Sequence, residues 1–417
     1  MLQIKALPER RNFIFCVLVS SNLPFIMAPK SRKKNSTPLN IMVTGFSGVG
    51  KTAFVRTLCE TLTNLETDPI PELSGPLSKT EKPYTVSLEF DYEGDRIALT
   101  VIDTPGFQVN TPIEKGLQEI TEYIENQFDL AIAEESKVKR NPKAVDTRIH
   151  VCLHFLDVSR RELGANDLEI LRRLSDRVNV IPVIGKGDTL TTAQRTALQP
   201  TIMRSIFDKY KIPIFGYPDL EEEEDYEVLD TVQEEDEEEE EESKEPNGDV
   251  EEEKPATTAA VEQPSSLYDE ICNDTDLDTL DEETRGLVEY LQKSPYVLIS
   301  YEENPETGRP IVIASKAQNN HVDEEEIAMS PQPSHVDTNS LIGRQYPWAT
   351  LDCLNPQFSD FSVLKTLLLS SHRKLLVTET IERFYEGYRT EKLLLKKANK
   401  TMSVVMGKKI LEELHHL

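Results

Sequence analysis

Short apolar runs alternate with segments of helical periodicity along the first half of the chain. Apolar runs of strand length occupy residues 39–44, 98–103, 147–158, 177–188 and 212–217. Segments with helical spacing of apolar positions occupy residues 53–62, 113–135, 166–176 and 192–210. Alternation of this kind predicts a mainly parallel sheet covered by helices on both faces. The sequence therefore indicates an α/β fold.

A hairpin and a long amphipathic helix complete this pattern. Residues 84–106 alternate apolar and polar positions on either side of "YEGD", which predicts a β-hairpin with its turn near Gly94. A further strand is expected at residues 294–302, followed by helices toward the C-terminus. The helical segment 113–135 places apolar side chains on one face, at Leu117, Ile120, Ile124 and Phe128.

The charge of the chain is concentrated in one segment. The net charge is −28, and residues 219–254 contribute −20 of it through 22 Asp and Glu against two Lys. Acidic runs with few apolar residues cannot offset chain entropy, so residues 219–266 are predicted to be a disordered insertion. Residues 316–338 form a second, polar insertion. The rest of the chain has a net charge of −8, which argues against nucleic acid as a partner, because nucleic-acid binding depends on Lys and Arg that neutralise phosphates.

Phosphate binding is predicted by "GFSGVGKT" at residues 45–52, which lies between a strand and a helix of the predicted fold. The spacing is that of the phosphate-binding loop, G-x-x-x-x-G-K-[ST]. Backbone N–H groups and the helix N-terminus would hold the phosphate, Lys51 would reach its β and γ oxygens, and the Thr52 hydroxyl would bind Mg²⁺. A chance match is the alternative, and the flanking elements argue against it.

Two further motifs follow in the order that a nucleoside triphosphatase requires. In "DTPG", Asp103 can hold Mg²⁺ and the Gly106 N–H can sense a γ-phosphate. In "GKGD", the Asp188 carboxylate can accept from both N1–H and N2–H₂ of guanine, while Lys186 packs along the ring. Adenine cannot offer both donors, which penalises ATP. The three motifs together predict a guanine-nucleotide-binding domain.

A family resemblance rests on "GRQYPWATLD" at residues 343–352, which is similar to the element that distinguishes septins, filament-forming GTP-binding proteins, from Ras-like relatives. The segments "VNVIPVIGKGDTLT", "DTRIHVCLHFLDV" and "YIENQFDLAIAEE" resemble septin segments in the same order, and "TETIERFYEGYRTEKL" resembles the helix that closes the septin domain. The resemblance covers roughly residues 40–217 and 294–392. It implies a divergent, fungal-type septin with the P-loop GTPase fold, a septin-type β-hairpin and C-terminal helices.

The resemblance also implies domain boundaries and site residues. An N-terminal extension with a basic segment would span residues 1–39, a septin-type GTP-binding domain 40–392 with the two insertions, and a short C-terminal helix 393–417. GTP or GDP and Mg²⁺ would be the cofactors, with Thr52 and Asp103 as metal ligands. The residues implied to bind the nucleotide are Gly45, Ser47, Gly48, Val49, Gly50, Lys51, Thr52, Ala53, Gly106, Lys186, Asp188, Gly343 and Arg344.

Other septin subunits are the implied partners. Trp348 would stand in the interface formed across the nucleotide pocket, and ordinary core packing is the alternative. Arg161 and Gln194 replace a histidine and a glutamate that septins direct toward the neighbouring subunit. The usual "AKAD" reads "GKGD" here, and its glycines would loosen the strand end. The replacements at Arg161 and Gln194 predict pairing with a different septin more readily than with itself.

Hydrolysis is expected to be slow or absent. Ras-like enzymes orient the attacking water with a glutamine directly after the glycine of "DTPG", whereas Phe107 occupies that place and Gln108 lies one residue too far. Thr80 falls where hydrolysing septins carry a catalytic switch threonine, or is simply a polar loop residue. The expected function is a filament subunit. One alternative is a monomeric switch GTPase. The other is a scaffold that holds its nucleotide permanently and uses the acidic insertion as its functional surface.

The N-terminal region and the cysteines bear on location. Residues 1–26 contain a short apolar run like that of a signal sequence, but a nucleotide site needs cytosolic nucleotide, so secretion is not expected. An alternative start at Met27 or an over-long gene model is expected instead. The scattered cysteines fit reduced thiols, and "HVCLH" at residues 150–154 indicates core packing rather than a metal site. A cytoplasmic, cytoskeletal location is predicted. A basic cluster in the N-terminal extension either binds anionic lipid or is a solvated tail, and it is formed by Lys30, Arg32, Lys33 and Lys34. If it binds lipid, the protein is expected at a membrane cortex or septum.

Overall fold

The computed structural model describes the part of the chain that carries the predicted domain. The described residues are 36–63, 75, 79–108, 111–139, 145–157, 163–218, 266–274, 280–314 and 340–415. They all belong to one compact unit, Ser36–Leu417. The predicted N-terminal extension up to residue 35, the acidic insertion up to residue 265 and the polar insertion lie outside the described residues.

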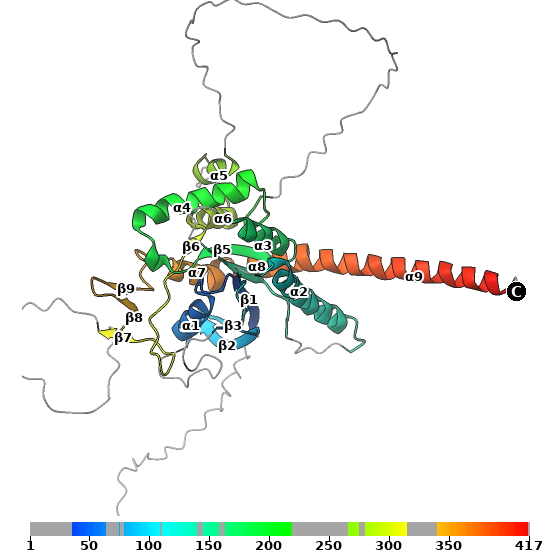
Figure 1. Ribbon diagram of the computed structural model, residues 1–417, viewed down its shortest axis with the longest axis horizontal. Helices are drawn as coiled ribbons and strands as arrows, with labels where there is room; N and C mark the ends of the chain where they lie inside the picture. Colours follow the sequence, from blue (N-terminus) through cyan, green and yellow to red (C-terminus); the bar gives the residue numbers. More distant parts are fainter. Residues whose placement is uncertain are drawn as a thin grey trace, which may run out of the picture. The chain divides into compact units, whose positions relative to one another are not determined.

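A six-stranded sheet forms the centre of the domain (Figure 1). Its strands are β1 (Thr37–Gly45), β2 (Tyr84–Tyr92), β3 (Asp95–Asp103), β4 (Val151–Leu156), β5 (Asn179–Ile184) and β6 (Tyr296–Val297). The spatial order is β2-β3-β1-β4-β5-β6, and only β2 runs antiparallel to its neighbour. Gly45 pairs with Phe155 and Val43 with Asp103, so the carboxyl ends of β1, β3 and β4 meet at one edge. The predicted hairpin is confirmed, with Gly94 at positive φ in its turn.

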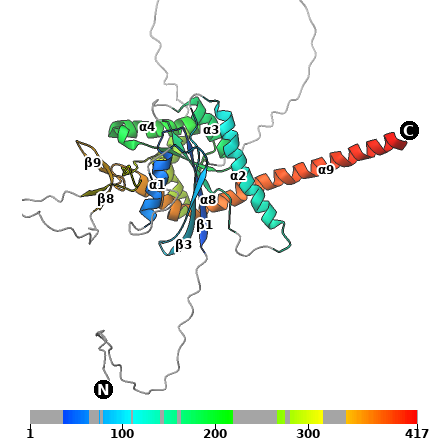
Figure 2. The same cartoon turned by 60° about the horizontal axis from the view of Figure 1, so that its bottom comes forward.

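Helices cover both faces of this sheet, as the alternating pattern predicted (Figures 1 and 2). On β4, the Phe155 ring packs on Phe54 of α1 (Lys51–Leu62) at 5.5 Å, and Phe54 also meets Phe361 of α7 (Phe361–Thr366). The preceding His154 contacts Asp167 of α3 (Ala165–Ser175). Consecutive side chains of a strand point to opposite faces, so α1 and α7 lie on one side of the sheet and α3 on the other.

The remaining helices flank these layers. The predicted apolar face of α2 (Ile113–Glu135) is buried at Leu117, Ile120, Ile124 and Phe128. Helix α4 (Thr192–Arg204) continues as a π-helical turn, Ser205–Lys209. The others are α5 (Leu267–Asp269), α6 (Glu282–Lys293), α8 (Arg373–Glu379) and α9 (Glu386–His415). Helix α9 is continuous across residue 393, where the sequence analysis placed the start of a separate C-terminal helix. None of the helices in the described ranges combines the length and apolar character needed to cross a membrane.

The strand predicted at residues 212–217 is absent, and that prediction was wrong. Its apolar side chains are buried, but Lys211 and Gly216 both adopt positive φ and bend the chain at each end. The backbone N–H of Ile212 donates to Ile206 and that of Phe215 to Val180, which leaves no continuous ladder. The strand expected at residues 294–302 is likewise reduced to the two residues of β6.

A second, three-stranded antiparallel sheet lies beside α1 in both views (Figures 1 and 2). It is formed by β7 (Val312–Ala314), β8 (Ser340–Gln345) and β9 (Thr350–Asp352) in that order. Strands β8 and β9 form the hairpin that carries "GRQYPWATLD", which confirms the predicted hairpin element. This small sheet brings residues from the end of the chain to the carboxyl edge of the main sheet.

Candidate functional site

The phosphate-binding loop joins β1 to α1 as predicted. Gly45 has φ of 139°, and a Cβ there would lie 2.5 Å from the Phe155 carbonyl oxygen, so only glycine lets β1 and β4 approach this closely. Gly50 is left-handed immediately before α1, which starts at Lys51. The N-terminal end of α1 therefore faces the concave side of the loop, where its free N–H groups favour an anion.

Lys51 is nearly buried in this loop, with 6% of its surface exposed. Its ammonium donates to the carbonyl oxygens of Gly45 at 2.9 Å and Phe46 at 2.7 Å. Burial lowers the pKa of Lys51 to about 8, against an opposing effect of the Asp103 carboxylate. A partly desolvated cation of this kind gains most when a phosphate oxygen approaches it.

Oxygen ligands gather at the end of β3. The Thr52 hydroxyl donates to Asp103 Oδ2 at 2.7 Å and the Thr80 hydroxyl to the same atom at 3.2 Å, while the two hydroxyl oxygens are 3.1 Å apart. Asp103 Oδ1 is buried without a hydrogen-bond partner. Burial raises the pKa of Asp103, although the hydrogen bonds from Thr52 and Thr80 and the charge of Lys51 oppose the shift. A hard cation bound to these oxygens would fit the donor set and neutralise the carboxylate.

The predicted base-specifying carboxylate lies just after β5. Asp188 Oδ2 accepts from Arg344 Nη1 at 3.0 Å and from the Tyr346 hydroxyl, and the Asp188 side chain is 7% exposed. Both donors come from the β8–β9 hairpin. Gly343 lies in β8 directly before Arg344 and is buried, and its carbonyl oxygen accepts from the Glu302 N–H. Arg344 is thus placed beside Asp188, as the resemblance implied.

Most of these groups line a single cavity of about 430 Å³, a size suited to a small-molecule ligand. Four implied site residues do not line it: Gly45, Val49, Asp103 and Gly343. Lys79, Thr104 and Ser300 line it and were not singled out from the sequence. Lys79 and Thr104 adjoin predicted residues and could have been found, whereas Ser300 lies far along the chain and carries no local signal. The residues lining the cavity are Ser47, Gly48, Gly50, Lys51, Thr52, Ala53, Lys79, Thr80, Thr104, Gly106, Lys186, Asp188, Ser300 and Arg344.

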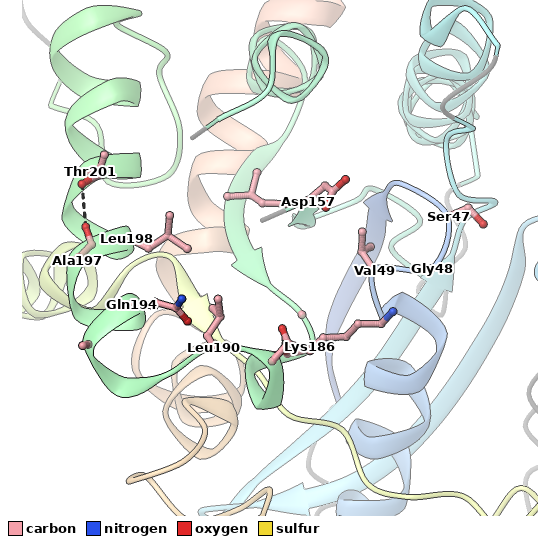
Figure 3. A pocket seen from close by; sticks show the side chains of 14 residues that line it. Ser47, Gly48, Val49, Asp157, Lys186, Leu190, Gln194, Ala197, Leu198 and Thr201 are labelled. Carbon is pink, nitrogen blue, oxygen red and sulfur yellow. Dashed lines mark hydrogen bonds between the residues drawn. The ribbon is translucent and has the colours of Figure 1, made fainter. Parts of the chain in front are cut away.

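A second cavity, of about 870 Å³, adjoins the first and is shown in Figure 3. Figure 3 shows the Lys186 side chain extending beneath Gly48 and Val49, and both cavities share this lysine. Gln194 of α4 lines the second cavity, but its Oε1 accepts from the Thr191 N–H in a capping box. Part of the Gln194 amide is therefore committed to its own helix. Arg161 lies outside the described residues.

The glycines of "GKGD" pack closely rather than loosening the strand end, so that interpretation was wrong. A Cβ on Gly185 would lie 2.1 Å from the Val49 carbonyl oxygen, and one on Gly187 would lie 2.5 Å from Val297 Cγ1. Both residues are buried. The missing methyl groups let the phosphate-binding loop and β6 approach the base end of the site.

Trp348 is not a core residue: it is 80% exposed, which contradicts the core alternative. Its ring stacks on Tyr346, with centroids 5.2 Å apart and an interplanar angle of 15°. Phe107, by contrast, is buried and packs on Phe46. Gln108 is exposed, and no glutamine is among the described residues that line the cavity of about 430 Å³.

The "HVCLH" segment is buried throughout, with His150 directly before β4 and the other four residues within it. His154 Nε2 lies 3.1 Å from Asp167 Oδ1 and its Nδ1 lies 3.1 Å from the Thr44 hydroxyl. His150 Nδ1 accepts from the Asn40 N–H at 2.8 Å. Both histidines thus take part in hydrogen bonds within the core, as the packing interpretation predicted.

Comparisons with known proteins identify the family. The septin family model matches residues 35–243 and 325–402. The chain is 30% identical to septin homolog spn3 of Schizosaccharomyces pombe over 367 residues, covering 87% of this chain and 75% of that protein. It is also 30% identical to cell division control protein 11 of Saccharomyces cerevisiae over 370 residues, covering 86% of this chain and 67% of that protein.

A solved structure shares the fold. The septin GTPase domain from Chlamydomonas reinhardtii superposes with a TM-score of 0.51 at 18% identity, covering 86% of this chain and 99% of that one. This likeness agrees with the mainly parallel sheet and its helices. The chain therefore has a P-loop GTPase fold. With the family model matching most of its length, the chain belongs to the septin family of filament-forming GTP-binding proteins.

Proposed function

We propose that this septin is a subunit of hetero-oligomeric filaments in which the bound guanine nucleotide supports a subunit interface. One observation carries the proposal: the β8–β9 hairpin holds Asp188 through Arg344 and exposes Trp348 four residues later. Tryptophan and tyrosine are enriched among the residues that carry most of the binding energy at protein interfaces, which supports a partner that covers this hairpin. A monomeric switch GTPase would gain nothing from leaving this side chain in water.

The pocket would hold GTP or GDP with Mg²⁺. Thr52 and Asp103 would bind the cation, and Lys51 and the loop N–H groups the phosphates. The chemistry that a bound Mg²⁺ would supply there is positive charge that offsets the charge of the phosphates. The orphaned, buried Oδ1 of Asp103 supports a cation at this point, because a buried carboxylate oxygen without a partner is costly.

Hydrolysis would be slow, with Thr80 as the residue that positions the attacking water. Its hydroxyl lies in the cavity within reach of Asp103 and Thr52, which supports a site role over that of an ordinary loop residue. Phe107 packs inward, so a water-orienting glutamine is missing from the place where Ras-like enzymes hold it. A nucleotide that is turned over slowly would act mainly as a structural ligand.

Membership of the family supports a proposal for partners and location. The partners would be other septins, with Trp348 and the free part of Gln194 at the interface and Arg161 nearby. The relatives named for septins and cell division control support a cytoskeletal role at a division site. Lys30, Arg32, Lys33 and Lys34 would add an attraction for anionic lipid of about 1 kcal/mol each.

Light scattering of the chain, alone and co-expressed with other septins, tests this proposal. Trp348→Ala should disrupt pairing but leave nucleotide affinity within about tenfold, because a buried interface aromatic commonly contributes about 2 kcal/mol or more. Lys51→Ala should remove nucleotide and pairing together. Leu130→Ala, at an exposed apolar residue of α2, is the matched control and should pair normally. A strictly monomeric wild type that hydrolyses GTP rapidly and is indifferent to Trp348→Ala would instead indicate a switch GTPase.

A further inference from the structure

The hydrogen bonds at Asp188 leave one of its oxygens fully used. A carboxylate oxygen offers about two acceptor positions. Oδ2 of Asp188 already accepts from Arg344 Nη1 and from the Tyr346 hydroxyl. Guanine needs both oxygens at once, one for N1–H and one for N2–H₂. A guanine can therefore bind in this way only if one of the two protein donors leaves Oδ2.

The phenol of Tyr346 is the donor that can leave at lower cost. Arg344 carries a charge that pairs with Asp188 in a site where only 7% of the carboxylate side chain is exposed, and losing that charge pair costs more than losing a neutral donor. The Tyr346 hydroxyl can instead turn toward water, since the residue is only partly buried. Arg344 keeps its position at the base end of the cavity.

The ring of Tyr346 is held from its other side by Trp348. The two rings stack at 5.2 Å, and the Tyr346 N–H donates to the Ala349 carbonyl oxygen at 2.8 Å, which closes the hairpin turn. This arrangement directs the phenol toward Asp188 while leaving Trp348 exposed. Any movement of Tyr346 changes the surroundings of the Trp348 indole.

We propose that Tyr346 is a latch on the base-specifying carboxylate: its hydroxyl occupies Asp188 in the absence of guanine and is displaced when guanine binds. This inference rests on the proposed guanine site. Its consequence is that Tyr346 lowers the affinity for guanine nucleotides and couples binding to the exposed Trp348 surface. Tyr346 is thus a positioning residue that regulates the site.

The test compares the full-length chain with Tyr346→Phe, which removes the hydroxyl and retains the stacking ring. Competition of unlabelled GDP, with Mg²⁺, against a fluorescent GDP analogue should show about three- to tenfold tighter binding, the effect of removing one competing hydrogen bond. Tyr388→Phe is the matched control, because its hydroxyl also donates to a carboxylate, Asp129, at 3.0 Å in another part of the domain. Its GDP affinity should equal that of the wild type.

A second readout uses fluorescence, because Trp348 is the only tryptophan in the sequence. GDP should shift its emission in the wild type, and by less in Tyr346→Phe, where no hydroxyl has to be displaced. Unchanged or weaker GDP binding by Tyr346→Phe would overturn the latch.

The Asp188→Asn background separates this failure from failure of the guanine site. There, Tyr346→Phe should no longer tighten binding. If Asp188→Asn itself leaves GDP affinity unchanged, the guanine site is misassigned. If it weakens GDP binding and Tyr346→Phe has no effect in the wild-type background, only the latch is wrong.

Discussion

Raising the pH should weaken nucleotide binding through Lys51. Burial lowers the pKa of this lysine to about 8 in the chain without ligand, so it loses its proton within an accessible pH range. A phosphate placed against the ammonium would favour the charged form and raise the pKa again. Binding therefore takes up a proton above pH 8, and the affinity must fall as the pH rises.

The magnitude follows from the fraction of Lys51 that is protonated before binding. With a pKa of about 8, roughly nine-tenths of the lysine is charged at pH 7 and about one-tenth at pH 9. If the bound lysine recovers its ordinary pKa, GDP affinity should drop about tenfold between these two pH values. A lysine that kept a pKa near 10.5 in the ligand-free chain would give almost no change.

Stability supplies a second readout with the opposite sign. The unfolded lysine keeps its proton up to about pH 10.5, whereas the folded one releases it above about pH 8, so the unfolded state binds more protons between these values. The Lys51 contribution to the free energy of unfolding without ligand should therefore increase as the pH rises, by up to about 3 kcal/mol in total. The free energy of unfolding in urea should be measured for the wild type and for Lys51→Met at each pH. The difference between the two proteins isolates the Lys51 contribution from that of other titrating groups.

Calorimetric titration with GDP and Mg²⁺ at several pH values from 7 to 9 is the assay. Lys51→Arg is the control, because arginine stays charged throughout and leaves only the titration of guanine itself. The wild type should lose about tenfold more affinity than the control, with proton uptake visible as a dependence of the heat on the buffer. Parallel pH profiles for the two proteins would refute the argument for a depressed lysine pKa.

Three further predictions concern the base, the strand end and the insertion. Asp188→Asn should weaken GTP and GDP binding by about 2 kcal/mol or more, since a charged acceptor becomes an amide; equal wild-type affinity for ATP and GTP would count against this. Gly185→Ala should destabilise the domain by about 1–3 kcal/mol in thermal unfolding, because its Cβ would meet the Val49 carbonyl oxygen at 2.1 Å, whereas Gly387→Ala, with open space around it, should not. Deleting residues 221–262 should preserve soluble folding and GDP binding, because loop closure depends weakly on loop length; loss of either contradicts it.

The phosphate end of the site could be predicted from the sequence because its geometry is local. A strand, a glycine loop and a helix within residues 39–62 fix where Lys51 and Thr52 lie, and Asp103 ends the neighbouring strand β3. Thr80 was placed by resemblance alone. Its contact with Asp103 depends on how the chain enters β2, which no local pattern encodes.

The base end depends on contacts between distant parts of the chain, and there the sequence indicated less. Tyr346 reaches Asp188 across 158 positions, and the resemblance pointed to Arg344 and Trp348 but not to the tyrosine between them. The misplaced strand at residues 212–217 has a similar origin: apolar spacing predicts burial, but not whether the backbone pairs with a neighbour. Two positive-φ residues decided that question, and one of them is Lys211, which carries no turn signal.

The geometry of the hairpin explains why nucleotide binding and pairing should depend on each other in this septin. Arg344 and Trp348 are four residues apart on one hairpin, and Tyr346 between them contacts both Asp188 and the Trp348 ring. A partner that covers Trp348 would restrict the ring to which Tyr346 is stacked, while a guanine at Asp188 would compete with the Tyr346 hydroxyl. Both events act on the same side chain. The free energy of either must therefore depend on whether the other has occurred, and by the same amount in both directions.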